Sequence, residues 1–255
     1  MMNMKRLTRI LTALLSIAIL CFVGVYVWAE WSTPDPLPVA IDALIADETV
    51  LIEESGSHII FRPATGAKQT GLILYPGGFV EPASYALHAR GIVAAGYPVI
   101  LIKAPLNLAF TALNGASDYI DNAQFSAVEK WVVGGHSLGG NTAALFTEDN
   151  LERVDGLLLW ASYPPESTDL SQTDLAVLSL YGTADGVISK EELDASRANL
   201  PASAQFVAVE GGNHAQFGSY GAQDGDSPAT ISAADQVEIV VRETVQFLAE
   251  IDETE

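Results

Sequence analysis

The sequence contains the pentapeptide Gly135-His136-Ser137-Leu138-Gly139, a serine flanked by glycines. An apolar run precedes it and a stretch rich in small residues follows it, which indicates a sharp turn from a buried strand into a helix. Glycines at both flanks allow such a turn and leave the serine hydroxyl exposed at its tip. A serine hydroxyl becomes a good nucleophile only when a base takes its proton. The pattern therefore predicts a nucleophilic Ser137; an ordinary serine in a tight turn is the alternative interpretation.

Four histidines compete for the role of that base. His58 lies in an early hairpin, and His88 lies in the middle of an expected helix. His136 is adjacent to Ser137, and its side chain is expected to point away from the site. His214 lies in a loop directly after the last expected strand, from which it can reach across to Ser137. We therefore expect His214 to be the base, with a surface loop histidine as the alternative interpretation.

A carboxylate has to orient such a histidine. Asp185 follows the end of an expected strand by four residues and has a glycine on either side of it in Gly182-Thr-Ala-Asp-Gly186. Asp155 starts a strand rather than ending one, and Asp169 and Asp174 lie in a loop rich in serine and threonine. Asp185 is therefore the predicted acid, which gives the chain order Ser, Asp, His.

An oxyanion formed by attack on a carbonyl needs two preorganised backbone donors, each worth roughly 3–4 kcal/mol. The N–H of Leu138, directly after the nucleophile and at a helix start, is the first expected donor. The second is expected in the loop that follows the early buried strand ending at Tyr75. Gly78 is the predicted donor there and Phe79 the next candidate, while a plain turn at Gly77-Gly78 is the alternative.

Strand and helix patterns alternate after residue 39, which predicts how these residues are positioned. The expected strands are 50–53, 59–61, 71–75, 99–103, 131–134, 154–161, 176–181 and 205–209, the first two forming a hairpin. The expected helices are 84–95, 137–147, 190–199 and 232–251. Such alternation implies a mostly parallel sheet with helices on both faces. Because ligands of these sheets bind outside the carboxyl ends of the strands, the candidate residues are expected to meet at that edge.

From residue 72 to the C-terminus the chain resembles the α/β-hydrolase superfamily. Ser137, Asp185 and His214 match the nucleophile, acid and base of that family. The resemblance implies the α/β-hydrolase fold and hydrolysis of a carboxylic ester or lactone by an acyl-enzyme mechanism. It also implies a small-molecule ester substrate and no metal or organic cofactor.

Within the superfamily the chain is most similar to small bacterial serine hydrolases near the dienelactone hydrolases. Three segments carry this similarity: Tyr75-Pro-Gly-Gly78, residues 103–109 and residues 211–221. The chain departs from related patterns at two points. Pro76 stands where many esterases have the histidine of a His-Gly motif, and the nucleophile is a serine where dienelactone hydrolases typically have a cysteine.

The site is expected to be open. Only residues 162–175 lie between two expected strands, too few for a lid of several helices, so the fold is expected to have a minimal lid and the site to suit short or soluble acyl substrates. Candidate lining residues, with the protein core as the alternative, are Leu106, Leu108, Phe110 and Phe217. Two other function classes stay open: a peptidase or amidase that uses the same residues, and a catalytically silent domain that serves as a binding module.

The overall composition limits what the chain can bind. It has 12 Lys and Arg against 32 Asp and Glu, a formal net charge of −20. Such an excess of negative charge repels phosphate backbones and excludes nucleic-acid binding, and solubility is its simplest interpretation. Cys21 is the only cysteine, which excludes an intrachain disulfide and a thiolate-based structural metal site.

The N-terminal segment predicts a membrane anchor. Ile10 to Ala29 holds 20 residues without a charge, the length with which a helix crosses about 30 Å of hydrocarbon. The basic cluster of Lys5, Arg6 and Arg9 before it is expected to stay in the cytoplasm and to send the rest of the chain outward as a single-pass, extracytoplasmic domain. A cleaved signal peptide, with a secreted product, is the alternative.

Other features of this segment set the expected boundaries. Leu20 precedes Cys21 where a lipoprotein signal has a small residue, so lipidation is not expected. Without a Gly-x-x-x-Gly pattern, nothing indicates helix dimerisation, and the oligomeric state stays open. We predict a transmembrane segment over residues 1–31, a proline-rich spacer over 32–38 and one α/β-hydrolase domain over 39–255.

Overall fold

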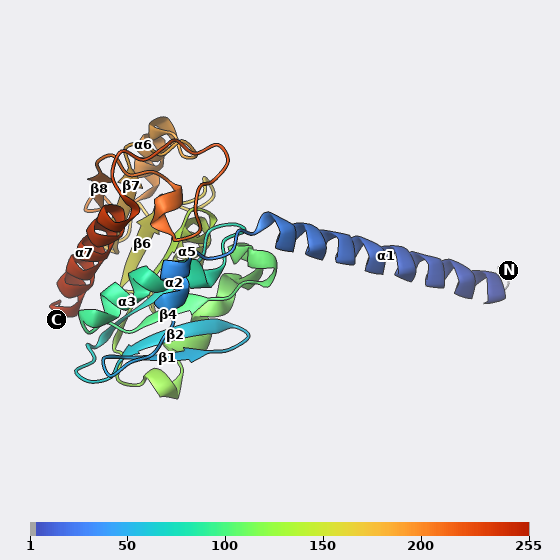
Figure 1. Cartoon of the computed structure of the whole chain (residues 1–255), viewed down its shortest axis with the longest axis horizontal. Helices are drawn as coiled ribbons and strands as arrows, with labels where there is room; N and C mark the ends of the chain where they lie inside the picture. The colour runs from blue at the N-terminus through green and yellow to red at the C-terminus, as the bar shows by residue number, and fades with distance from the viewer. Residues whose placement is uncertain (1–3, 255) are drawn as a thin grey trace.

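The structure, a computed structural model of the chain, describes the backbone of residues 4–254 and the side chains of residues 11–254. Figure 1 shows a domain built around one sheet, with a single long helix projecting from it. The expectation of a mostly parallel sheet with helices on both faces is confirmed. The side chains of the basic cluster Lys5, Arg6 and Arg9, and residues 1–3, lie outside the described part, so the orientation drawn from that cluster stays a prediction.

Eight strands form the sheet in the order β1-β2-β4-β3-β5-β6-β7-β8. Their bounds are β1 (Val50–Glu54), β2 (His58–Pro63), β3 (Thr70–Tyr75), β4 (Val99–Ile102), β5 (Lys130–His136), β6 (Gly156–Trp160), β7 (Ala176–Gly182) and β8 (Gln205–Val209). The expected hairpin of β1 and β2 is present, and β2 also runs antiparallel to β4, whereas all other pairs are parallel. As a result His58, at the start of β2, pairs with Ile102 at the end of β4. The hairpin turn therefore lies at the same edge as the carboxyl ends of the parallel strands.

Helices cover both faces of the sheet. The α-helices are α1 (Met4–Ser32), α2 (Pro38–Asp42), α3 (Ala86–Ala94), α4 (Ser117–Ile120), α5 (Leu138–Glu148), α6 (Lys190–Ser196) and α7 (Ala233–Asp252). The 3₁₀ helices are η1 (Pro82–Tyr85), η2 (Pro105–Asn107), η3 (Ala109–Ala116), η4 (Ala123–Phe125), η5 (Arg197–Asn199) and η6 (Ala215–Phe217). α3 and α7 pack on one face, over a core that includes Phe61, Trp160 and Phe247. α5 covers the other face, over a core that includes Ile73 and Phe146.

The connection between β4 and β5 is more structured than the sequence indicated. Residues 103–129 fold into η2, η3, α4 and η4, which the hydrophobic pattern did not reveal because no piece is long enough to repeat it. Leu106 and Asn107 both have positive φ, 60° and 52°. The segment expected to be too short for a lid, residues 162–175, contains no helix. The elaboration beside the sheet therefore follows β4 rather than β6.

Two element boundaries differ from the expectation for reasons of local geometry. The helix expected over residues 84–95 begins as η1, and α3 starts only at Ala86, because Tyr85 has a non-helical φ of −98° and ψ of 1°. The strand expected over 154–161 is limited to β6, since Ala161 has a φ of 40° that a strand cannot contain.

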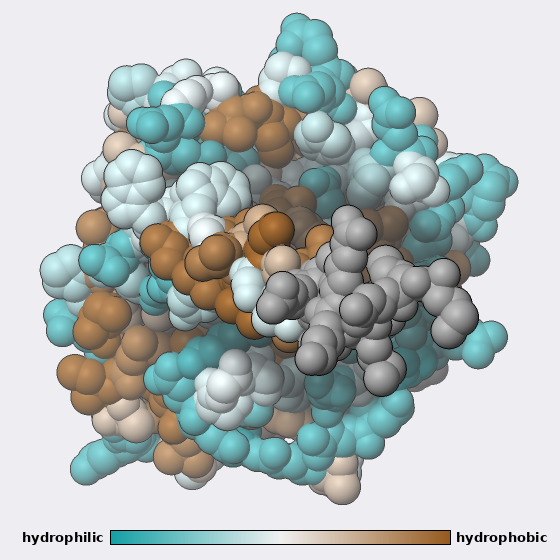
Figure 2. Space-filling model, turned by 90° about the vertical axis from the view of Figure 1, so that its right-hand side faces the viewer, coloured by the Kyte–Doolittle hydropathy of each residue, from teal (hydrophilic) through white to brown (hydrophobic). Residues whose placement is uncertain are grey.

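α1 leaves the domain as one helix on the side away from α7 (Figure 1). Its segment Leu11–Ser32 is 22 residues long and apolar enough to cross a membrane. Residues 11–28 of this segment are exposed. A signal sequence near an N-terminus meets the same criteria. Figure 2 looks along this helix toward the domain and shows apolar surface next to it, with hydrophilic residues along the right-hand and lower margins.

Candidate active site

Ser137 lies at the turn between β5 and α5, where the sequence places it. Its backbone has a φ of 51° and a ψ of −122°, a conformation that costs a non-glycine residue about 1–3 kcal/mol. Two hydrogen bonds hold the turn: Ser137 N–H donates to the Trp160 carbonyl at 3.0 Å, and the Ser162 hydroxyl donates to the Ser137 carbonyl at 2.7 Å. The neighbouring strand β6 and its continuation thus maintain a strained turn that carries one half-buried serine hydroxyl.

The glycines of the pentapeptide permit the close approach of α5 to the sheet. A Cβ on Gly135 would lie 2.2 Å from the carbonyl carbon of Gly139. A Cβ on Gly139 would lie 2.2 Å from the carbonyl oxygen of Tyr75. Because the clashing atoms belong to the backbone, no side-chain rotation relieves either contact. The spacing Gly-x-Ser-x-Gly is therefore the condition for α5 to start directly at the ends of β3 and β5.

The predicted acid and base meet in a buried pair. Asp185, in the loop after β7, and His214, in the loop after β8, are joined by a bond of 2.9 Å between Asp185 Oδ2 and His214 Nδ1. Their side chains are only 5% and 1% exposed. The other carboxylate oxygen, Oδ1, accepts the backbone N–H groups of Val187 and Ile188, both at 2.8 Å. One oxygen thus fixes the carboxylate to its own loop, and the other orients the imidazole.

Asp226 is a residue of this site that the sequence analysis missed. Its carboxylate accepts the N–H of Gly186 at 2.9 Å, from the Asp185 loop, and that of Ala215 at 2.8 Å, from the His214 loop. The N–H of His214 itself lies 3.4 Å from Asp226 Oδ1. Asp226 therefore holds together the two loops that supply acid and base. Its sequence context, Gln-Asp-Gly-Asp-Ser, indicates only a turn.

His214 lies next to the end of β5. Its ring centroid is 4.7 Å from that of His136, the residue before Ser137. Among the described residues, the only side-chain partner of the imidazole nitrogens is Asp185, so no hydrogen bond joins the ring to the Ser137 hydroxyl. Such a bond often forms only in the substrate complex. The structure thus pairs Asp185 with His214 and places both beside the serine turn, without a hydrogen bond between His214 and the Ser137 hydroxyl.

A buried tyrosine connects this turn to the loop after β3. The Tyr85 hydroxyl accepts the N–H of Gly77 at 2.9 Å and lies 2.8 Å from His136 Nδ1. Because its oxygen is the acceptor for Gly77, its proton is free to be donated to Nδ1, which has to be unprotonated. Burial, and then the nearby His214, hold the pKa of His136 well below its usual range, consistent with a neutral ring.

The prediction that the His136 side chain points away from the site is therefore wrong. Its buried ring lies beneath the serine turn, in contact with His214 and Tyr85. Tyr85 gave no sequence signal, because it lies 51 residues before its partner.

The backbone amides of the loop after β3 differ in what they bind. Gly77 N–H is held by Tyr85, and Phe79 N–H donates to the Asn107 carbonyl at 2.7 Å. Within the described part of the chain, Gly78 N–H has no acceptor. A Cβ on Gly78 would lie 3.1 Å from Leu138 Cδ2, so this glycine faces the start of α5. Of the two predicted donors in this loop, Gly78 is thus the amide that stays available, beside the amide of Leu138.

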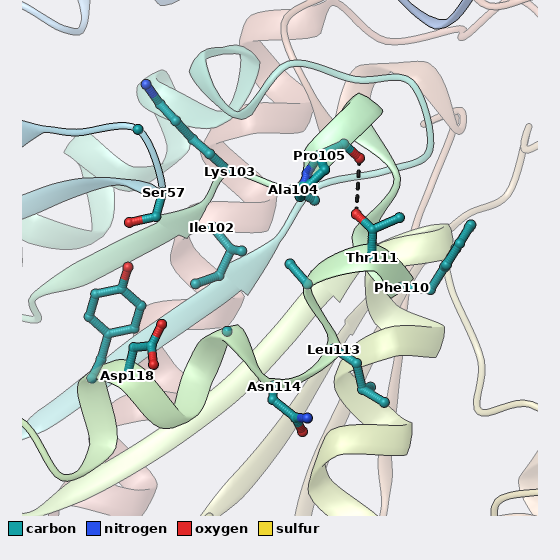
Figure 3. Close-up of a pocket in the computed structure, with 14 residues that line it drawn as sticks. Ser57, Ile102, Lys103, Ala104, Pro105, Phe110, Thr111, Leu113, Asn114 and Asp118 are labelled. Atoms are coloured by element: carbon teal, nitrogen blue, oxygen red, sulfur yellow. Dashed lines mark hydrogen bonds between the residues drawn. The ribbon is translucent and has the colours of Figure 1, made fainter. Parts of the chain in front are cut away.

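Several cavities border the same edge of the sheet. One of about 410 Å³ is lined by Gly78 and Phe79, and one of about 310 Å³ by Ser162 and Asp185. A larger cavity of about 640 Å³ lies beside the end of β4. Figure 3 shows it, with Phe110 and Thr111 on one side and Ser57 on the other.

Two of the four candidate lining residues can be placed from burial and cavity lining. Phe110 lines the large cavity beside β4, away from the acid–base pair. Phe217 is fully buried and stacks on His136 with ring centroids 5.9 Å apart, so it belongs to the core. In residues 4–254, no group of three or more His, Cys, Asp or Glu side chains has the arrangement of a metal site.

Comparisons with known proteins identify the family and the fold of the chain. A family model described as "Alpha/beta hydrolase family" matches residues 71–238. A search of curated proteins found no match to the chain. The fold is similar to that of a solved protein described as a "predicted CIB-like hydrolase" from Thermoplasma acidophilum, with 20% identity over 79% of this chain and 99% of that one, at a TM-score of 0.59.

Two further solved structures show the same fold. A dienelactone hydrolase from Anabaena variabilis has 15% identity over 79% of this chain and 98% of its own, with a TM-score of 0.59. Est1E from Butyrivibrio proteoclasticus, solved with ferulic acid bound, has 14% identity over 83% of this chain and 99% of its own, also with a TM-score of 0.59. At these identities the similarity concerns the fold.

Proposed function

The chain belongs to the alpha/beta hydrolase family, and from this premise we propose that it hydrolyses carboxylic esters or lactones with Ser137 as nucleophile. His214 is the base and Asp185 the acid that orients it. The observation that supports this most strongly is the buried bond of 2.9 Å between Asp185 and His214, placed beside a strained serine turn. An imidazole whose Nδ1 is bound to a carboxylate has its Nε2 left to accept a proton from a hydroxyl.

The reaction proceeds by acyl transfer. His214 takes the Ser137 proton while Oγ attacks the carbonyl carbon, and the alcohol leaves with the proton that the imidazole returns to it. Water, activated by the same imidazole, then cleaves the acyl-enzyme and releases the carboxylic acid. Asp185 stays ionised throughout, stabilising the imidazolium and fixing its tautomer.

The developing oxyanion is bound by the amides of Gly78 and Leu138. Neither amide donates to a carbonyl or side chain of the described residues. The N–H of Phe79, the other predicted donor, instead stabilises the loop by donating to the Asn107 carbonyl. Donors that are already oriented stabilise the transition state without a reorganisation cost.

α1 anchors this domain to a membrane in the same proposal, with the domain on the extracytoplasmic side. The support is the length of Leu11–Ser32 and the exposure of residues 11–28, together with the basic residues that precede it in the sequence. Secretion after cleavage of a signal peptide is the competing arrangement, and the mass of the mature N-terminus in a native membrane preparation separates the two.

The proposed function is tested by labelling the full chain in detergent with a fluorophosphonate probe, followed by peptide mapping. A probe of this kind reacts with a serine that is activated by a base and an oxyanion hole, so we expect the label on Ser137. Ser57→Ala is a matched control, since Ser57 also lies beside a histidine (3.2 Å from His58 Nδ1) and its variant should label normally. A folded chain without label would support the silent binding module and end the proposal.

A panel of p-nitrophenyl esters against the corresponding anilides separates the esterase from a peptidase or amidase. We expect ester turnover to exceed anilide turnover by orders of magnitude. Comparable rates on both would assign the same residues to amide hydrolysis.

A further inference from the structure

The end of α1 is seated on the loop that carries the proposed oxyanion donor. The Trp28 ring packs edge-on against the Phe79 ring, with centroids 5.1 Å apart. Ala29, one residue later, is only 2% exposed. Phe79 directly follows Gly78, so Trp28, near the end of α1, contacts the residue next to the proposed oxyanion donor.

A second set of contacts fixes this junction. Asn107 accepts the Phe79 N–H through its carbonyl, and its side-chain amide donates to the Thr33 hydroxyl at 3.3 Å. The Thr33 hydroxyl in turn donates to the Ala29 carbonyl at 2.9 Å. Four residues further on, Leu37 N–H donates to the Ser219 carbonyl at 2.8 Å. The spacer thus lies bound along the domain and does not act as a free tether.

A cavity opens at the same place. It has a volume of about 410 Å³, within the range of small-molecule sites. Trp31, Ser32 and Pro34 line it from the helix end, and Gly78, Phe79 and Val80 line it from the loop, with Tyr220 among its other walls. Trp31 is 88% exposed, and tryptophan is the residue that favours the boundary between hydrocarbon and water. When α1 spans a bilayer, this cavity lies at the membrane surface.

The charges around the end of α1 limit which substrates can enter this cavity. Asp224 lines the cavity. Glu81, which directly follows the lining residue Val80, lies in a group of carboxylates, since burial and then the nearby Asp35 and Glu30 raise its pKa. These carboxylates, on a chain of net charge −20, disfavour an anionic headgroup at the mouth.

We propose that the substrate is an uncharged amphiphilic ester, held at the membrane surface, that enters through the cavity between the end of α1 and the loop of Gly78. This inference rests on the proposed function and on α1 as an anchor. It replaces the expectation of a short, soluble acyl substrate. The ester bond is cleaved by Ser137, the acyl chain is released as a carboxylic acid into the bilayer, and the alcohol leaves into water.

The test uses the full chain reconstituted in phosphatidylcholine vesicles. Two substrates are compared: p-nitrophenyl acetate from solution, and 1-oleoylglycerol carried in the same vesicles. In a variant, about 12 Gly and Ser residues are inserted after Ser32, which adds an average reach of about 20 Å. We expect hydrolysis of 1-oleoylglycerol to fall about tenfold or more as the site leaves the surface, while the rate on p-nitrophenyl acetate stays within about twofold and shows that the domain is folded.

A substitution gives an independent measure. Trp28→Ala removes the ring that covers Phe79 and should slow only the vesicle-borne ester, about three- to tenfold. Tyr26→Ala is the matched control, because Tyr26 is exposed on the same helix two residues earlier. Lysophosphatidylglycerol, with its anionic headgroup, should be cleaved at least about tenfold more slowly than 1-oleoylglycerol.

The outcomes separate the two proposals. If the native chain cleaves p-nitrophenyl acetate but not 1-oleoylglycerol, or if the insertion leaves both rates unchanged, the surface substrate is wrong and the ester hydrolase stands. If neither ester is cleaved and Ser137 takes no phosphonate label, the proposed function fails, and this inference with it.

Discussion

Two serine–histidine clusters lie at the same edge of the sheet, and they differ in what holds the histidine. In one, His214 Nδ1 binds the buried Asp185 carboxylate at 2.9 Å. In the other, His58 Nδ1 lies 3.1 Å from the Ser55 hydroxyl, 3.2 Å from the Ser57 hydroxyl and 2.7 Å from the Tyr119 hydroxyl.

The second cluster has the more spacious surroundings, since Ser57 and Tyr119 line the cavity of about 640 Å³ shown in Figure 3. Yet His58 Nε2 is buried without a partner among the described residues, and no carboxylate of that part of the chain orients the ring. Burial, counteracted by Glu53, lowers the pKa of His58, so this ring has less tendency to hold a proton. The buried carboxylate, rather than the size of the cavity, therefore distinguishes the cluster that we propose to be catalytic.

The largest effect is expected from replacing the serine of each cluster. Ser137→Ala should reduce ester turnover by about 10⁶-fold, as removal of a triad serine does, while Ser57→Ala should leave it within about twofold. Steady-state rates on p-nitrophenyl acetate, with circular dichroism to verify folding, measure both. Activity that survives in Ser137→Ala and disappears in Ser57→Ala would exchange the roles of the two clusters.

The next effect concerns the groups on the two Nδ1 atoms. Asp185→Asn should lower kcat by about 10⁴-fold, because an amide stabilises the wrong imidazole tautomer. Tyr119→Phe removes the hydroxyl that lies beside His58 Nδ1 and should change kcat little. A loss below tenfold for Asp185→Asn would show that another acid orients His214.

A smaller effect is expected from Tyr85, which positions the oxyanion loop and does not touch substrate. Tyr85→Phe frees Gly77 N–H and His136 Nδ1 at once, and kcat should fall about 10- to 100-fold, less than the loss of an oxyanion donor itself. KM should change little, because the ring and its packing remain. A rise in KM with kcat unchanged would assign Tyr85 to substrate binding instead.

The smallest effect concerns the pH dependence of stability, for which we compare the buried His88 with His58. Burial lowers the pKa of His88 to about 4, and within residues 11–254 neither ring nitrogen has a hydrogen-bond partner. The unfolded chain therefore binds more protons below about pH 6.5, and the stabilisation present above that pH is lost as pH falls toward about 4, by up to about 3 kcal/mol.

Thermal melts of the native chain between pH 4 and 7 measure this loss, to which the buried His136 adds in the same direction. His88→Leu should flatten the profile, whereas His58→Gln should alter it less because that ring is partly exposed. An unchanged slope in His88→Leu would mean that His88 is already solvated in the folded chain.

The sequence was a good guide wherever the information is local. Strand, turn and helix around Ser137 follow from an apolar run, two glycines and a small-residue helix, and the alternation of elements predicted the parallel sheet. The short helices of residues 103–129 were missed, because their shape depends on packing against the sheet and not on periodicity.

Sequence alone therefore determined the candidate nucleophile, acid and base, because each lies in the turn or loop that follows a strand whose end is readable from hydrophobicity. Only the tertiary structure decided what surrounds them. Asp226 joins two loops, Tyr85 contacts a residue 51 positions away, and Trp28 rests on Phe79. These contacts arise because the sheet brings distant segments to one edge, and no spacing along the chain encodes a distance that only folding creates.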